Sequence, residues 1–511
     1  MRLVQDFLES AALQAPEKTA LIFEGQSWTY AQIDQMANRL ARGLAERGVA
    51  RGDRVVLYLP NRPETVIGIF AVLKADAVFV VVNPSTKSEK LAHILNNCQA
   101  KALITLTSRS AIARKMLDEV RSLESAVLVD SDAEPRTEDQ AGFTTLSDIL
   151  ANHSATPPPR MCIDQDLACL IYTSGSTGQP KGVMSAHENV VFAATAITTY
   201  LKNVADDVVI CALPLSFDYG LYQPLMVFSV GATLVLERSF TYPAQFLRRL
   251  QDEKVTGLPG VPTIFSILLQ MDLTRYDLRS LRYVTNTAAA LPVAHIERLR
   301  RSFPQASLYS MYGLTETKRT LYLPPEQLDH RPGSVGIAIP GTEVWIEDDD
   351  GRRLGPGEVG ELVVRGGHVM RGYWGDPSAT AERFRAGPFP GERVCYSGDL
   401  FRMDQEGYLY FVARKDDIIK SRGEKVAPKE VENVLYAIGG VAEAAVVGVP
   451  DPILGEAIKA FVVSRDRALT EADVLRHCSA HLEDFMIPKY VVFAESLPKS
   501  DNGKIRKDAL K

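Results

Sequence analysis

Helix and strand patterns alternate along the first part of this chain, and that alternation limits the possible folds more than any other feature. Apolar residues recur at helical spacing between Ile33 and Leu44, Gly48 ends the pattern, and residues 54–59 have the pattern of a buried strand. The units that follow are a helix from Glu64, a strand over 77–82, a helix from Ser85 towards Asn96 and a strand over 102–106. Because parallel strands need long crossovers that usually hold a helix, this order predicts an α/β fold.

The rest of the chain extends this fold and then changes in character. Its 511 residues predict two or more domains, on the order of three structural units. Residues 150–160 hold a proline cluster and predict a surface linker. A second α/β stretch is predicted by strands near 167–172, 208–213, 232–236 and 307–312, with helices at 242–253 and 292–302. Short strands then predict a β-rich part over about 340–415. The last hundred residues predict a loop at 420–425, a helix from Pro428, strands at 444–449 and 459–463 and a helix near 471–482.

Charge and cysteine content exclude several classes of function. The chain has 57 Lys and Arg against 63 Asp and Glu, so we expect no basic surface for nucleic acid or for an anionic membrane. The most apolar long stretch, residues 66–82, is interrupted by Lys74 and Asp76 and is too short for a membrane span. The six cysteines have no zinc or disulfide pattern, and the N-terminus has no signal-peptide pattern. We therefore expect a cytoplasmic protein with reduced thiols.

A glycine- and hydroxyl-rich segment, YTSGSTGQPKG at 172–182, directly follows an apolar strand pattern. Its glycines permit close backbone approach, its hydroxyls and N–H groups are donors, and Lys181 adds positive charge, which together suit a triphosphate. The spacing differs from that of a Walker A loop. A flexible surface linker is the alternative, but open α/β sheets place ligand crevices at the carboxyl ends of strands. We therefore predict a phosphate site formed by Thr173, Ser174, Gly175, Ser176, Thr177, Gly178 and Lys181.

This loop resembles the phosphate-binding signature of the adenylate-forming ligases, the superfamily of acyl-CoA synthetases, amino-acid adenylation domains and luciferases. Further motifs of that superfamily follow in the same order: YGLTET at 312–317, YSGD at 396–399, ARKDD at 413–417 leading to IKSRGE at 419–424, and PKSDNGK at 498–504. The resemblance extends from about Trp28 to the C-terminus. It implies a large N-terminal domain over 1–415, made of layered α/β subdomains and the β-rich part, followed by a small, mobile α+β C-terminal domain over 416–511.

The resemblance also implies which residues bind ATP and Mg²⁺. Tyr312 would stack on adenine, Thr315 would bond the α-phosphate, and Glu316 would hold Mg²⁺. Asp399 would accept hydrogen bonds from the ribose hydroxyls, and Arg414 would support the same nucleotide. Outside this context, a Thr-Glu pair is more typical of a helix cap, and Asp399 of a turn after Gly.

Lys504 resembles the catalytic lysine of the superfamily, which bridges the substrate carboxylate and the α-phosphate while the acyl-adenylate forms. A cation fixed at that point stabilises the charge that develops on phosphorus, and Thr315 and Glu316 complete the catalytic set. The alternative for Lys504 is a solvated basic tail. Asp416 stands where the superfamily has its hinge, and Lys420 and Gly423 stand in the loop that enters the site for the thiol step. Rotation about Asp416 would then present the two faces of the small domain in turn.

Three places depart from the superfamily pattern. Asp76 stands where Gly is usual, Thr287 and Ala288 stand where a Gly pair often lines the adenine, and Ala413 replaces Gly before Arg414. None of these changes touches the phosphate chemistry, but the change at Thr287 and Ala288 alters how closely the backbone can approach adenine.

Phe217 and Asp218 bear most directly on the choice of substrate. They resemble the amino-acid-activating branch, in which the aspartate pairs with the substrate ammonium, and a carboxylate in an apolar pocket is costly without a cation. Some fatty-acid-activating relatives also have an Asp-x-Gly-Leu stretch, which leaves a non-amino acid open. Met311, Lys318 and Arg319 flank the YGLTET motif. They either face the pocket or the pantetheine tunnel, or provide surface charge beside a loop.

These features support three hypotheses. In the first, the chain is an ATP-dependent, AMP-forming ligase that activates a small amino acid (α, β or cyclic) and transfers it to the phosphopantetheine thiol of a separate carrier protein, as in nonribosomal peptide or polyketide biosynthesis. In the second, the substrate is a non-amino carboxylic acid and coenzyme A is the acceptor. The third is a catalytically silent nucleotide-binding regulator, which Lys181, Glu316, Asp399 and Lys504 together disfavour.

Overall fold

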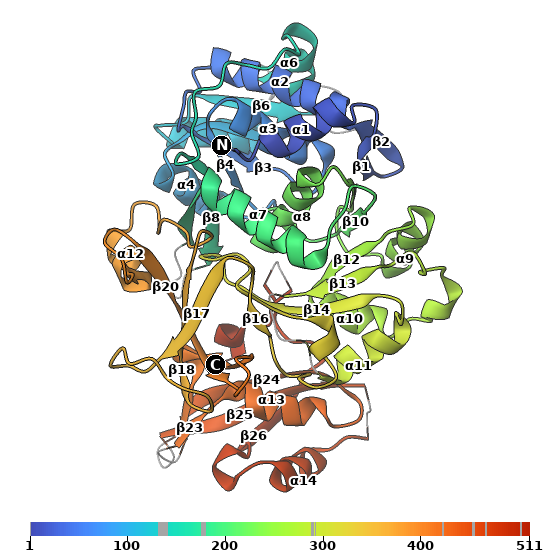
Figure 1. The fold of residues 1–511 in the computed structure, drawn as a ribbon, viewed down its shortest axis with the longest axis vertical. Helices are drawn as coiled ribbons and strands as arrows, with labels where there is room; N and C mark the ends of the chain where they lie inside the picture. Colours follow the sequence, from blue (N-terminus) through green and yellow to red (C-terminus); the bar gives the residue numbers. More distant parts are fainter. Residues whose placement is uncertain are drawn as a thin grey trace.

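The computed structural model describes residues 2–130, 142–174, 180–287, 291, 293–421, 424–451, 455–465, 468–500 and 503–510 (Figure 1). Two large sheets form the first part of the chain, and two five-stranded sheets form the second part. The mixed α/β architecture confirms the fold class predicted from the sequence.

A seven-stranded sheet forms the first layered unit, in the order β7-β6-β5-β3-β4-β8-β9. Its strands are β3 (Arg54–Tyr58), β4 (Val78–Val81), β5 (Ala100–Leu106), β6 (Ser125–Val129), β7 (Thr144–Thr145), β8 (Leu167–Ser174) and β9 (Pro180–Ala186). All neighbours are parallel except β8 and β9, which pair antiparallel. The parallel layering predicted from the sequence is therefore confirmed up to β8, and the β8–β9 hairpin was not predicted.

A nine-stranded sheet forms the second layered unit, in the order β16-β15-β14-β13-β12-β10-β11-β1-β2. Its strands are β1 (Thr19–Phe23), β2 (Gln26–Thr29), β10 (Val208–Cys211), β11 (Thr233–Leu236), β12 (Gly257–Gly260), β13 (Tyr283–Asn286), β14 (Ser307–Tyr312), β15 (Leu321–Leu323) and β16 (Ile337–Ala338). The central strands from β1 to β14 are parallel, whereas β2, β15 and β16 pair antiparallel at the two edges.

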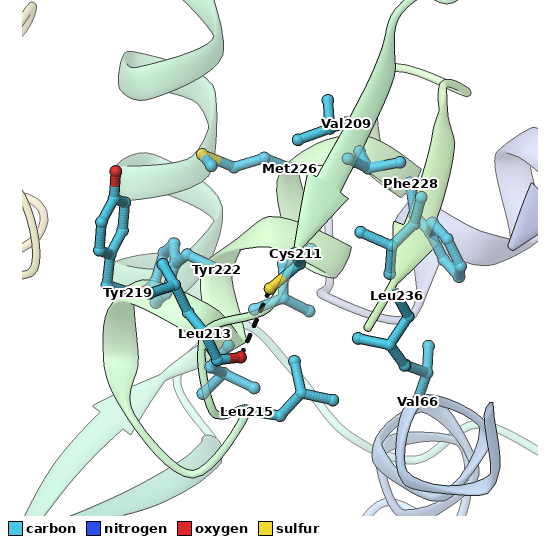
Figure 2. Packing of buried hydrophobic residues seen from close by; sticks show 14 of the residues in the cluster. Val66, Val209, Cys211, Leu213, Leu215, Tyr219, Tyr222, Met226, Phe228 and Leu236 are labelled. Carbon is cyan, nitrogen blue, oxygen red and sulfur yellow. Dashed lines mark hydrogen bonds between the residues drawn. The ribbon is translucent and has the colours of Figure 1, made fainter. Parts of the chain in front are cut away.

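Helices cover both sheets and share one apolar core between them. The first group is α1 (Asp6–Gln14), α2 (Tyr30–Glu46), α3 (Pro63–Lys74), α4 (Ser88–Asn97), α5 (Ser110–Glu119), α6 (Leu146–Asn152) and α7 (His187–Leu201). The second group is α8 (Asp218–Ser229), α9 (Pro243–Asp252), α10 (Pro262–Leu268) and α11 (Val293–Ser302). Residues of α2, α3, α7 and α8 pack in a single cluster with residues of both sheets. Figure 2 shows part of this cluster, where Cys211 of β10 packs beside Tyr222 and Met226 of α8.

The second part of the chain contains the two smaller sheets. One is formed by β17 (Thr342–Glu347), β18 (Val359–Gly366), β19 (Phe384–Ala386), β20 (Arg393–Met403) and β21 (Leu409–Arg414), with α12 (Pro377–Arg383) beside it. The other is formed by β22 (Ile419–Ser421), β23 (Glu424–Val426), β24 (Val441–Asp451), β25 (Gly455–Ser464) and β26 (Tyr490–Phe493). Helices α13 (Pro428–Tyr436) and α14 (Glu471–His481) share an apolar core with the second of these sheets. The β-rich part predicted over about 340–415 is therefore present.

Two sequence predictions need correction at the level of single elements. Residues 150–152 end helix α6 instead of belonging to a linker. The coil after α6 is held to α2 by Arg39, which donates to the backbone oxygen of His153 at 2.7 Å. Of the loop predicted at 420–425, residues 420–421 and 424–425 lie in the antiparallel strands β22 and β23. Residues 422 and 423 lie outside the described residues.

The two charged residues that interrupt the apolar run at 66–82 have different structural roles. Asp76 has a φ of 54°, in the left-handed region that favours glycine, which accounts for the usual Gly at this position. Its Oδ2 accepts a hydrogen bond from the Met161 N–H at 2.7 Å. Lys74 lies at the end of α3 with its side chain 1% exposed, and its Nζ lies 2.7 Å from Glu9 Oε1 and 2.9 Å from Asp34 Oδ1. Lys74 thus joins α3 to α1 and α2.

We predict that Lys74→Met destabilises the protein, because it leaves Glu9 and Asp34 without their shared cation. The expected loss in the free energy of unfolding is about 2–3 kcal/mol, less than for a fully buried pair because both carboxylates keep some contact with water. Lys115→Met is the matched control, since Lys115 is exposed and its pair with Glu119 at 3.7 Å lies on a helix surface. Urea unfolding of both variants measures the difference, and equal midpoints would contradict the structural role of Lys74.

Candidate active site

Residues from motifs far apart in the sequence meet where the four sheets approach one another. The Tyr312 hydroxyl at the end of β14 donates to Asp399 Oδ2 of β20 at 2.6 Å. The Tyr373 hydroxyl donates to Glu316 Oε1 at 2.5 Å. Lys181 Nζ of β9 lies 5.5 Å from the centre of the Tyr373 ring. These contacts place the 312–317 motif next to both the β8–β9 hairpin and the β-rich sheet.

The predicted phosphate segment lies on the β8–β9 hairpin. Thr173 and Ser174 are the last residues of β8, and Lys181 is the second residue of β9. The Lys181 side chain is part-buried, and its Nζ lies 3.6 Å from Asp376 Oδ2. The other predicted members of the segment, Gly175, Ser176, Thr177 and Gly178, lie outside the described residues. The phosphate role of the whole segment stays a prediction.

Tyr312, Asp399 and Arg414 form one group on the predicted nucleotide side. The Tyr312 ring packs edge-to-face on Phe401, with the ring centres 4.9 Å apart. Arg414 Nε lies 3.7 Å from Asp399 Oδ1. Burial raises the pKa of the Asp399 carboxyl, whereas Arg414 and the Tyr312 hydroxyl act in the opposite direction. A buried carboxylate with acceptor capacity left over suits the predicted contact with ribose hydroxyls.

Glu316 is the buried carboxylate predicted to hold Mg²⁺. Its carboxylate accepts a hydrogen bond from the Tyr373 hydroxyl. The same carboxylate helps to raise the pKa of Arg383, although burial of that guanidinium acts in the opposite direction. Among the described residues, no group of three or more His, Cys, Asp or Glu side chains gathers to hold a metal ion. A single carboxylate fits Mg²⁺ nonetheless, because this ion commonly takes one or two carboxylates together with substrate phosphates and water. Glu316 therefore suits that ion.

Lys504 comes from the end of the chain and points into the same site. Its Nζ lies 5.9 Å from the centre of the Phe217 ring. Before it, the Gly503 N–H donates to Ser500 O at 2.8 Å, and Gly503 has a φ of +78°. A Cβ at Gly503 would lie 2.9 Å from Thr263 Oγ1, so Gly503 packs closely on α10.

The setting of Lys504 disfavours the solvated-tail alternative, because the residue is part-buried and its Nζ lies near the Phe217 ring. Burial, followed by the nearby Arg414, lowers the pKa of Lys504, whereas Asp218, Asp399 and Glu316 act in the opposite direction. The carboxylates of Asp218, Asp399 and Glu316 are thus within electrostatic range of Lys504. By contrast, Lys499 of the same segment pairs with Glu443 at 2.5 Å.

The predicted substrate residues are all buried or part-buried. Asp218 is the first residue of α8, and Phe217 is its N-cap. Met311 is buried in β14, and its Sδ accepts a hydrogen bond from the Tyr200 hydroxyl at 2.9 Å. Asp218 Oδ2 lies 3.6 Å from Arg319 Nη1.

This pairing corrects two expectations. The sequence suggested that a substrate ammonium would supply the cation for Asp218, but Arg319 of the chain itself already stands beside it. The alternative in which Lys318 and Arg319 are surface charge is also wrong, because Lys318 is 0% and Arg319 is 2% exposed. Their place directly after the 312–317 motif was the one signal in the sequence, and it did not reveal their burial.

The predicted hinge lies between the two small sheets. Asp416 is exposed in a short 3-10 turn (Lys415–Asp417) between β21 and β22. Lys415 Nζ lies 2.7 Å from Asp349 Oδ1 and 3.2 Å from Glu361 Oε2. Lys420 is in β22, and Gly423 lies outside the described residues. The domain boundary at 415/416, the hinge and the thiol-step loop stay predictions.

The other departures from the superfamily pattern are at Thr287, Ala288 and Ala413, and the structure describes the first and the last of these. Thr287 follows β13, is 2% exposed, and has a buried hydroxyl without a hydrogen-bond partner among the described residues. Ala288 lies outside the described residues. Ala413 is buried in β21 opposite Leu400.

In the described part of the chain, no helix is long and apolar enough to cross a membrane.

Family models match most of the chain. Residues 8–374 match the model of the AMP-binding enzyme, and residues 430–504 match the model of the AMP-binding enzyme C-terminal domain. A long-chain-fatty-acid–CoA ligase of Bacillus subtilis is 32% identical over 99% of this chain and 93% of its own length.

Solved structures agree with these matches. ATP-bound MatB from Rhodopseudomonas palustris has a TM-score of 0.89 and 28% identity, covering 99% of this chain and 98% of that one, whereas its apo form has a TM-score of 0.81. An O-succinylbenzoate coenzyme A synthetase from Bacillus subtilis, in complex with ATP and magnesium ion, has a TM-score of 0.84, 28% identity and 99% coverage of both chains. The arrangement of the present structure is thus closer to the ATP-bound than to the apo form of MatB. The chain belongs to the AMP-binding enzyme family, the adenylate-forming superfamily, and is an AMP-forming acid–thiol ligase that uses ATP and Mg²⁺.

Proposed function

We propose that this ligase is an acyl-CoA synthetase, which activates a non-amino carboxylic acid and transfers the acyl group to coenzyme A. The observation that supports this best is the place of Arg319, 3.6 Å from Asp218. In the amino-acid hypothesis, the substrate ammonium pairs with this carboxylate. Here a second cation at Asp218 would lie against Arg319, and like charges in a buried site repel.

The relatives support the same choice. The curated relative and the O-succinylbenzoate enzyme are both named as coenzyme A ligases or synthetases. An activated amino acid and a carrier protein, which the sequence suggested first, have weaker support: a dimodular nonribosomal peptide synthase of Bacillus subtilis is 31% identical over 99% of this chain, but the match spans only 21% of that relative.

We assign Lys504 to the first half-reaction. Its Nζ lies 5.9 Å from the Phe217 ring, within electrostatic range of Asp218, Glu316 and Asp399, which suits a cation that contacts the acid and the α-phosphate together. When bound, Mg²⁺ would neutralise charge on the triphosphate, and Glu316 would hold it. Tyr312 and Asp399 would orient the nucleoside, and Lys181 would bind the outer phosphates.

The second half-reaction needs a different face of the small domain. Lys504 fills part of the site in this structure, so a thiol that attacks the acyl-adenylate needs another approach. We propose that rotation about Asp416 withdraws Lys504 and brings the 420–425 segment to the site.

We predict that Lys504→Ala slows adenylate formation by roughly 10²–10³-fold, the range seen when one preorganised stabiliser of developing charge is removed. Pyrophosphate exchange measures this step with any acid that the enzyme accepts. Thioester formation from chemically supplied acyl-adenylate should stay within a few fold of wild type. Lys499→Ala is the matched control, because it removes a lysine of the same segment that pairs with Glu443. Equal slowing of both steps by Lys504→Ala would remove the proposed role.

We also predict the substrate and the acceptor. In pyrophosphate exchange, the best carboxylic acid should exceed its α-amino analogue in kcat/KM by about 10²-fold, because the ammonium would be buried beside Arg319. With that acid and ATP, free coenzyme A should yield acyl-CoA and AMP, measured by chromatography. Preference for the amino analogue, with transfer to a phosphopantetheinylated carrier protein but not to coenzyme A, would restore the amino-acid hypothesis.

A further inference from the structure

Two adjacent cations, Lys318 and Arg319, are buried near Asp218. Lys318 is 0% exposed and Arg319 is 2% exposed, and Arg319 is among the largest fully buried side chains of the described chain. Lysine and arginine are almost never fully buried unless an anion accompanies them. The expected arrangement is therefore one carboxylate for each cation.

The described residues supply only part of this compensation. Arg319 has five N–H donors. Its Nη1 lies 3.5 Å from Lys318 O and 3.6 Å from Asp218 Oδ2, both at or beyond the limit of a hydrogen bond. Its Nη2 is buried and has no partner among the described residues.

The positive charge of Lys318 is balanced even less by the residues around it. Its Nζ donates to the backbone oxygen of Thr315 at 2.9 Å, and no carboxylate of the described chain forms an ion pair with it. Burial lowers the pKa of Lys318, with Asp218 as the largest opposing influence. Asp218 and Glu316 thus act on Lys318 without forming an ion pair with it, and Asp218 is the one carboxylate of the described chain that forms an ion pair with either of these two buried cations.

The backbone holds both cations in place. Lys318 has a φ of 59°, in the left-handed region that is uncommon for residues other than glycine. A Cβ at Gly313 would lie 1.8 Å from Lys318 O, so glycine is required where the loop folds back on itself. The guanidinium of Arg319 also lies over the Tyr219 ring of α8, 4.3 Å from its centre. Strain in a buried, charged segment next to a binding motif is typical of a preorganised site.

The cations lie around the same carboxylate as Lys504. Arg319 forms the ion pair with Asp218, and Lys504 Nζ lies 5.9 Å from the ring of Phe217, the residue directly before Asp218. In agreement with this, Asp218 acts on the pKa of Lys318 and on that of Lys504. Lys504 is assigned above to the carboxylate that reacts. Lys318 and Arg319 are then available to a different anionic group of the same molecule.

We propose that Lys318 and Arg319 bind a second carboxylate of the substrate, so that the enzyme activates one end of a dicarboxylic acid. This inference rests on the proposed acyl-CoA synthetase function and specifies its substrate class. The second carboxylate accepts hydrogen bonds from Arg319 Nη2 and places a further negative charge beside the two buried cations. Asp218 holds the guanidinium in position. A monocarboxylic acid leaves these donors unpaired in the bound state, which is costly.

The test compares matched acids with the wild-type enzyme. Straight-chain α,ω-dicarboxylic acids of three to eight carbons are assayed by pyrophosphate exchange, each beside its half-amide and the monocarboxylic acid of equal length. The expected result is a kcat/KM at least about 10²-fold higher for the best dicarboxylic acid than for either partner, because the partners leave buried donors unpaired. Equal or higher values for the monocarboxylic acids across the series would overturn the inference. In that case, acyl-CoA formation from those acids would leave the proposed function standing, whereas no exchange with any acid would reject both.

Variants separate a binding role from a structural one. Arg319→Met should lower kcat/KM for the dicarboxylic acid by roughly 10²-fold, and leave that for the monocarboxylic acid unchanged or higher. Arg301→Met is the control, since Arg301 lies on the surface of α11 with its side chain 79% exposed.

Thermal unfolding and ATP binding check that the variants are folded. If Arg319→Met does not fold, Arg319→Lys, which keeps the charge, replaces it and should retain a reduced preference for the dicarboxylic acid. Equal loss on both classes of acid in a folded Arg319 variant that still binds ATP would show a purely structural ion pair and would overturn the inference.

Discussion

The acid pocket depends on the balance of charge around Asp218, at the first turn of α8. This carboxylate is buried, and Arg319 lies beside it at 3.6 Å. The position at the start of a helix favours a negative charge, because the backbone N–H groups of the first turn point towards it. Lys318 and Lys504 also lie within electrostatic range of Asp218. Three cations thus lie within electrostatic range of Asp218, which under the proposed function favours an acid over a substrate that brings an ammonium.

The nucleotide side is organised by contacts between different sheets. The hydrogen bond from Tyr312 to Asp399 joins the nine-stranded sheet to the β-rich sheet. The contact of Tyr373 with Glu316 joins the same loop to the segment before α12. Lys504 adds a contribution from the last residues of the chain. The site is therefore assembled from three parts of the chain: the 312–317 motif, the β-rich part with Tyr373 and Asp399, and the C-terminal part with Lys504.

Much of this site was predictable, because its residues stand in short motifs with fixed chemistry. Tyr312, Glu316, Asp399 and Lys504 were all assigned to one site from sequence, and the structure brings them together. The strands that precede the motifs were predictable as well, since buried parallel strands leave continuous apolar runs. The roles assigned to these residues in catalysis remain predictions.

The rest of the site could not be predicted, because it depends on tertiary contacts that local sequence patterns do not show. Helix α8 was missed because it is buried along most of its length and contains Gly220 and Pro224, so it has neither a polar face nor strong helix propensity. The burial of Lys318 and Arg319 depends on the close approach of Gly313 to the Lys318 backbone, which sequence spacing does not reveal. Without that burial, the partner of Asp218 appeared to be the substrate.

The central claim is that the pocket of this ligase takes an acid with a second carboxylate, held by Lys318 and Arg319. Calorimetric titration with two non-hydrolysable acyl-sulfamoyl adenosines tests it without turnover. The two compounds differ only at the far end of the acyl chain, which carries a carboxylate in one and a primary amide in the other. We predict that the carboxylate compound binds about 2–3 kcal/mol more tightly, a difference of roughly 30- to 150-fold in Kd. Equal affinities, or tighter binding of the amide, would contradict the account.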